Sequence, residues 1–169
     1  MKKFITLFAL LSLLVGISAQ EDEFQVPKKY QIKTEEDCAK YKEDIKKCVV
    51  WLMETPSNVE KNKRASASKF LLKWIGVTTD VSIILDSKVQ TFMEDPELLT
   101  IFIAGWAKDV LDTEENHKDP IRGNLAGINA VIDYYQKNKE FLEKNSAVEK
   151  YIKLKEKGKL EETIQKRYK

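Results

Sequence analysis

The acidic residues of this sequence are its first candidates for catalytic groups. Asp109 follows the most apolar run of the chain, LLTIFIAGWA, and could therefore be a carboxyl group at the wall of a pocket. More often such a residue marks the point where a helix emerges into water. Together with Asp133 or Glu94, Asp109 would form the two-carboxylate arrangement of a carboxylate-dependent hydrolase. Because the chain has 27 acidic residues, their presence alone selects no pair.

An amide and two aromatic residues form a second candidate site. Asn124 falls inside the apolar arc of a predicted helix, and a buried Asn needs hydrogen-bond partners. The structural interpretation is a hydrogen bond to a neighbouring loop, and the functional one is a ligand contact. Aromatic residues at helical spacing more often form core than a pocket. The candidate ligand-binding residues are Asn124, Trp106, Tyr135 and Asp109.

Several catalytic and metal-binding classes lack their motifs. The chain has one His, His117, and no G-x-S-x-G, G-x-G-x-x-G, P-loop or H-E-x-x-H. Asp112, Glu114 and Asn116 match the first ligand positions of a calcium loop, but His117 and Gly123 stand where that loop requires Gly and Glu. We therefore expect no catalytic residues, no metal and no cofactor.

The two cysteines, Cys38 and Cys48, fall on one predicted helix. At a rise of ~1.5 Å per residue their Cα atoms would be about 15 Å apart, beyond the ~7 Å limit for a disulfide. We expect no bond between them and two small buried hydrophobic side chains instead. Pairing between molecules in an oxidising compartment is the alternative.

The first residues have the pattern of an export signal. Residues 1–19, MKKFITLFALLSLLVGISA, combine a basic start, an apolar stretch and a small residue at Ala19. The apolar stretch is shorter than the ~20 residues of a transmembrane helix. Cleavage would remove Lys2 and Lys3 and leave a formally neutral chain, with no overall charge favouring nucleic acid. We expect a periplasmic or extracellular protein that does not span a membrane after cleavage.

Helix boundaries are indicated by capping residues and prolines. Asp95 and Asp119 each precede a proline, which suits the first turn of a helix. Capping-box patterns begin at Thr34 and Ser146. Gly76 and Gly158 suit the left-handed position after a helix end. The expected helices are 35–54, 58–75, 96–111, one that begins at 120, and 146–157. A short helix at 87–93 is an option, and residues 159–168 form either a last turn or a short helix.

These elements predict an all-α, single-domain bundle of five or six helices at 34–169, after a flexible leader at 20–33. LLTIFIAGWA, apolar almost all round, is the expected central helix. In the helix that begins at 120, Gly123, Gly127 and Ala130 form a small-residue strip that permits close helix packing. Residues 77–86 alternate like a strand, either as an extended β-like connector over the core or as half of a hairpin.

Four segments carry a resemblance to a known group. CVVWLMETP, FLLKWIGV, IFIAGWAKDVL and IRGNLAGINAVIDYYQKNKEFL occur in this order, and the chain resembles uncharacterised exported helical proteins of Bacteroidetes-type Gram-negative bacteria. The resemblance implies a small periplasmic or secreted helical protein and supplies no catalytic residue. Residues 146–169 hold eight basic and four acidic residues, which suits either an acidic partner or a solvated helix face.

The preferred function is a non-enzymatic binding or interaction module with an unknown protein or small-molecule partner. A hydrolase that uses carboxylates is the rival, and two such groups about 5–10 Å apart in a cleft would favour it. A helical inhibitor or immunity-like partner of another exported protein is the third hypothesis, which a large exposed apolar patch would favour.

Overall fold

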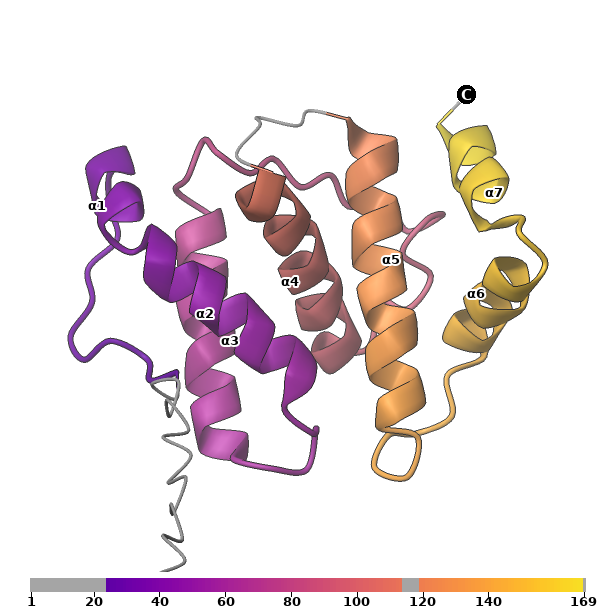
Figure 1. Ribbon diagram of the computed structural model, residues 1–169, viewed down its shortest axis with the longest axis horizontal. Helices are drawn as coiled ribbons and strands as arrows, with labels where there is room; N and C mark the ends of the chain where they lie inside the picture. The colour runs from indigo at the N-terminus through magenta and orange to yellow at the C-terminus, as the bar shows by residue number, and fades with distance from the viewer. Residues whose placement is uncertain (1–23, 114–118, 169) are drawn as a thin grey trace, which may run out of the picture.

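The computed structural model describes residues 24–113 and 119–168, and Figure 1 shows them as a bundle of helices. The predicted all-α fold is confirmed, since this part of the chain contains seven helices and no strand. The predicted signal peptide, His117 and most of the loop around it lie outside the described residues. The helices are α1 (Glu35–Lys40), α2 (Lys42–Glu54), α3 (Lys61–Ile75), α4 (Pro96–Thr113), α5 (Pro120–Lys137), α6 (Ser146–Glu156) and α7 (Leu160–Arg167).

The local start signals at three helices act as predicted. Thr34 and Asp37 form a reciprocal capping box at α1. Asp95 Oδ1 accepts the N–H groups of the first turn of α4, and Asp119 does the same at α5. These side chains satisfy backbone donors that have no partner within the helix.

The apolar helix α4 lies between α2 and α5, as Figure 1 shows, and most of its length is buried. Its buried residues run without interruption from Thr100 to Ala107. A helix with apolar side chains all round loses contact with water only if neighbours cover every side. The predicted central helix is therefore confirmed.

Helices α4 and α5 approach closely because glycines line their contact. A Cβ atom added to Gly123 would lie 2.0 Å from the Trp106 ring, and one added to Gly127 would lie 2.5 Å from the Phe102 ring. Real Cβ atoms do not make such short contacts, so each aromatic ring occupies the space that a larger side chain would need. The predicted small-residue strip forms this contact, and Gly105 of α4 joins it from the opposite side.

The predicted first helix is broken into α1 and α2, so the described residues hold seven helices instead of five or six. The break is at Tyr41, whose ring packs edge-on against Phe70 at 5.9 Å between centroids. A tertiary contact therefore overrides a continuous helical pattern. Cys38 and Cys48 end up on separate helices, and both are buried and unpaired within the chain, as expected.

Three other local expectations are wrong. Gly76 is right-handed, with φ −71°, because the chain continues for another turn in which Val77 and Thr78 donate to Trp74 O. The cap of α6 is Asn145 instead of Ser146, since the Asn145 amide oxygen accepts the N–H groups of the first turn. Residues 87–93 form separate turns instead of a short helix. Gly158 has the predicted left-handed backbone, with φ 64°.

Two segments without helix cover the bundle. Residues 77–86 form a connector with a turn and a bend over 77–80 and irregular backbone over 81–86. It pairs with no strand in the described chain, so the hairpin alternative is wrong. Residues 24–33 are packed instead of forming a separate leader, because Phe24 and Ile32 are buried in the core. Phe24 lies against Trp51, and Tyr30 lies against Phe70 at 4.8 Å between ring centroids. The sequence pattern missed this because single apolar residues in a polar stretch show no period.

Candidate functional site

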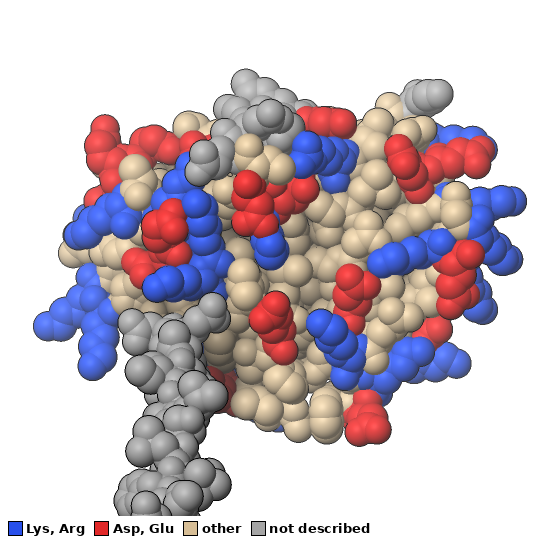
Figure 2. Space-filling model, in the orientation of Figure 1, with Lys and Arg blue, Asp and Glu red and all other residues tan. Residues whose placement is uncertain are grey.

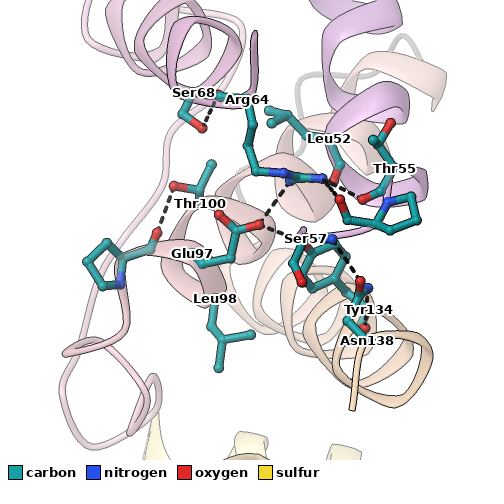
Figure 3. A network of polar contacts seen from close by, with 12 residues as sticks. Leu52, Thr55, Ser57, Arg64, Ser68, Glu97, Leu98, Thr100, Tyr134 and Asn138 are labelled. Atoms are coloured by element: carbon teal, nitrogen blue, oxygen red, sulfur yellow. Dashed lines mark hydrogen bonds and ion pairs between the residues drawn. The ribbon is translucent and has the colours of Figure 1, made fainter. Parts of the chain in front are cut away.

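A buried arginine ties four helices together. Arg64 of α3 is only 5% exposed, and its guanidinium donates to Leu52 O, Thr55 O and Pro56 O at the end of α2. The same group forms an ion pair with Glu97 of α4 at 2.9 Å (Figure 3). Arg64 thus supplies hydrogen-bond donors to carbonyls that the helix end leaves without partners.

Glu97 carries the network to α5. Tyr134 donates its phenolic hydrogen to Glu97 Oε1 at 2.5 Å, and burial together with this bond raises the pKa of Tyr134 far above its usual value. Asn138 Nδ2 donates to Tyr134 O, and Asn138 Oδ1 accepts the N–H of Ser57 (Figure 3). Arg64 and Glu97 each have a charged partner inside the protein, so the arrangement fixes helix ends. Among its buried polar atoms, Ser57 Oγ and Arg64 Nε have no hydrogen-bond partner in the described residues.

Arg64 is not among the residues predicted from the sequence pattern. A signal was present, however, since Arg64 has the helical spacing of three buried residues of α3, Ala67, Leu71 and Trp74. A charged residue in register with an apolar stripe has to find a partner when the stripe is buried.

Asn124 is fully buried, and each of its polar atoms has a partner. Its amide nitrogen donates to Pro120 O at 2.7 Å and to the Tyr168 hydroxyl at 2.5 Å. Gln90, in the loop before α4, donates to Asn124 Oδ1 and accepts from Asp86 N with its own oxygen. This is the hydrogen bond to a neighbouring loop that the structural interpretation named, and it leaves Asn124 no exposed atom to contact a ligand.

The two aromatic candidates are also buried. Tyr135 uses its hydroxyl to accept the backbone N–H of Asn145 at 3.1 Å, which anchors the start of α6. The Trp106 ring packs on Gly123, and its indole N–H has no hydrogen-bond partner among the described residues. Asn124 and Tyr135 therefore hold surrounding elements in place, while Trp106 belongs to the α4–α5 contact.

The three carboxylates proposed for a hydrolase are not brought together. Asp109 forms an ion pair with Arg122 at 2.8 Å, and Asp133 forms one with Lys155 at 3.1 Å. Asp133 lies about 16 Å beyond Arg122 along α5, at ~1.5 Å per residue. Helix α4 separates Pro96, two residues after Glu94, from Asp109 by about 20 Å. Both separations exceed the ~5–10 Å of glycosidase carboxylate pairs.

A groove lies at the surface where the loop before α4 meets α6 and α7. It consists of two adjoining hollows of about 490 Å³ and 340 Å³ that share Thr91, Ser146 and Ala147. We name it the connector groove. The first hollow is also lined by Phe92, Glu94, Asp95, Pro96, Glu143, Lys144 and Asn145, and the second by Lys150, Tyr151, Leu154 and Arg167.

The two ends of the connector groove differ in charge. The first hollow has three carboxylates, Glu94, Asp95 and Glu143, and one lysine. The second has Lys150 and Arg167 and no carboxylate. On the face drawn in Figure 2, basic and acidic side chains are interspersed. The opposite charges of the two hollows are therefore a local feature and not part of a large charged surface.

Three hydrogen bonds, of which only that from Tyr151 to Val89 O is buried, hold the basic end in place. Arg167 donates to Lys88 O and, at 2.7 Å, to the Tyr151 hydroxyl, which donates in turn to Val89 O. Arg167 directly precedes Tyr168, whose hydroxyl accepts from Asn124, and Asn145, which Tyr135 anchors, lines the acidic end. Two of the four predicted residues thus support the groove from behind without lining it.

Comparison of the chain with family models, with curated proteins and with solved structures finds no match in any of the three. Across residues 24–113 and 119–168, no helix has both the length and the apolar character needed to cross a bilayer. The same residues contain no group of three His, Cys, Asp or Glu side chains placed to hold a metal ion.

Proposed function

We propose that this protein is an exported, non-enzymatic binding module and that its ligand is a short peptide with free ends, bound in the connector groove. Export to the periplasm or beyond is supported by the pattern of residues 1–19 and by the resemblance to exported helical proteins of Bacteroidetes-type bacteria. A binding role agrees with the wide separation of the carboxylates that a hydrolase would need.

The observation that carries this proposal is the opposite charge of the two joined hollows. Glu94 and Glu143 form no ion pair with any described residue, and neither does Lys150. A ligand with an ammonium group at the acidic end and a carboxylate at the basic end would therefore meet unneutralised partners at both.

The length of the groove indicates the size of the ligand. Ser146, Lys150 and Leu154 of α6 line it at four-residue spacing, so it follows one face of that helix for about 12 Å. An extended peptide advances ~3.3–3.6 Å per residue, so three or four residues span this length. The half-buried Leu154 would contact a small side chain of the peptide.

The test is calorimetric titration of the purified protein with tetra-alanine and with its N-acetylated and C-amidated forms. We expect the free-ended peptide to bind, and each blocked form to bind about tenfold more weakly, since each loses one hydrogen-bonded charge pair of about 1.4 kcal/mol. Absence of heat from the free-ended peptide at millimolar concentration would contradict the proposal, as would equal binding of all forms. Sequencing of the secreted protein's first residues, with Gln20 expected first, tests export.

A further inference from the structure

A third hollow, separate from the connector groove, lies between residues 29–30 and helix α3. It has a volume of about 840 Å³ and is lined by Lys29, Tyr30, Ala65, Ser68, Lys69, Leu72 and Lys73. We name it the α3 groove. From it we propose that α3 is an interaction surface for an acidic amphipathic helix of a partner protein, a role separate from the connector groove.

The charge of the α3 groove calls for an acidic partner. Helix α3 has five basic residues and no acidic one. Of these, Lys63 and Arg64 form ion pairs with Glu60 and Glu97. Lys69 and Lys73, four residues apart on one edge of the groove, form no ion pair with any described residue, and the same holds for Lys29 on the opposite wall. Glutamates four residues apart on a second helix would match the spacing of Lys69 and Lys73.

The shape of the groove suits a helix. Ala65 and Ser68 are small, and the Ser68 hydroxyl already donates to Arg64 O at 2.9 Å, so this part of α3 presents an apolar surface. Small residues let a second helix axis approach to ~8 Å. Leu72 is 45% exposed at the end of the same face and offers an apolar anchor. Residues at positions 65, 68, 69, 72 and 73 follow the pattern by which one helix contacts another.

The opposite wall of the groove is held firmly. Tyr30 packs edge-on against Phe70 of the core, with 4.8 Å between ring centroids. Lys29, directly before it, has φ 57°, a left-handed conformation that is uncommon for a residue other than glycine. The fold thus maintains a turn of unfavourable geometry that presents a lysine beside the apolar surface.

The experiment uses two synthetic 21-residue amphipathic helices with the same leucine face, one flanked by glutamates and the other by lysines. Fluorescence anisotropy measures the binding of each to the full chain. We expect the acidic peptide to bind and the basic one to be rejected. Lys69→Glu combined with Lys73→Glu should lower the affinity for the acidic peptide at least about tenfold, as expected for the loss of two charge pairs.

The matched control is Lys61→Glu, which makes the same change on an exposed part of α3 outside the groove. It should alter the affinity less than about twofold. Leu72→Ala should lower the affinity for the acidic peptide although it changes no charge. The proposal would be overturned if the acidic peptide failed to bind, or if Lys61→Glu lowered its affinity as much as Lys69→Glu combined with Lys73→Glu. Circular dichroism verifies that each variant is folded. Lys150→Ala, which alters the connector groove, should leave the affinity for the acidic helix unchanged. The two proposed binding sites can therefore fail or succeed independently of each other.

Discussion

Gly105 of α4 and Ala130 of α5 face each other so closely that a Cβ atom on Gly105 would lie 2.4 Å from the Cβ of Ala130. The backbone oxygen of Ala126 would be 3.1 Å away. Neither neighbour is the flexible end of a side chain, so the two helices would have to move apart to admit one methyl group. This contact sets the separation of the two helices that form the centre of the bundle.

We therefore predict that Gly105→Ala destabilises the protein by about 2 kcal/mol, although alanine normally favours a helix by up to ~1 kcal/mol. Urea unfolding measures the change. The control is Gly76→Ala, where the added Cβ would meet Leu72 O at 3.4 Å and Lys73 O at 3.7 Å and the backbone is right-handed. This variant should stay within about 0.5 kcal/mol of the wild type. Ala130→Gly should restore part of the stability lost in Gly105→Ala, and an additive double variant would contradict the close contact.

Arg64 should be among the residues most sensitive to substitution. Arg64→Ala would leave Glu97 without its cation and the carbonyls at the end of α2 without a donor. We expect a loss of about 3 kcal/mol in the free energy of unfolding, the usual result of removing one partner of a buried ion pair. Arg64→Lys should recover only part of it, because an ammonium group cannot reach several carbonyls and a carboxylate at once. A loss below about 1 kcal/mol would show that the network is not structural.

Asn124 should act through the loop before α4. Asn124→Ala leaves the buried Gln90 amide and the Tyr168 hydroxyl without their partner, which should lower stability by about 1–3 kcal/mol. Hydrogen exchange should accelerate most in residues 86–92. The matched variant is Asn129→Ala on the same helix, because the Asn129 side chain donates only to Leu125 O within its own helix. Equal effects of the two substitutions would argue against a special role for Asn124.

The parts of the fold that the sequence predicts well are those set by local chemistry. Thr34, Asp95 and Asp119 cap their helices because a short polar side chain next to free N–H groups needs no distant partner. The apolar run 98–107 predicts burial because no other arrangement removes all its sides from water.

The parts that it misses depend on tertiary contacts or on near-equal local choices. Asn145 and Ser146 are both good capping residues, and the bond from Asn145 N to Tyr135 favours the first. The break at Tyr41 follows from a contact with Phe70, far away in the sequence. The connector groove could not be predicted either, since its lining comes from separate segments that only packing brings together.

Alkaline pH should destabilise the protein. Burial raises the pKa of the Cys48 thiol from 9.0 to about 12. Between these values the unfolded chain has lost a proton that the folded chain retains, so the free energy of unfolding falls as pH rises. Tyr134, whose pKa is also raised, acts in the same direction above pH 10.0, its ordinary pKa. Urea unfolding from pH 8 to pH 11 should show this fall, and Cys48→Ser should make it shallower. Identical pH slopes for the two proteins would contradict a buried thiol.

The most direct measurement of the central claim is a double-mutant cycle between Lys150 and the ligand carboxylate. Lys150 lines the basic end of the connector groove, whereas Lys153 is exposed on the same helix outside it. Calorimetric titration gives the affinities of the wild type, Lys150→Ala and Lys153→Ala for tetra-alanine and its C-amidated form. We predict that amidation weakens binding about tenfold in the wild type and in Lys153→Ala, but less than about twofold in Lys150→Ala. The same loss on amidation in all three proteins would contradict a carboxylate bound at Lys150.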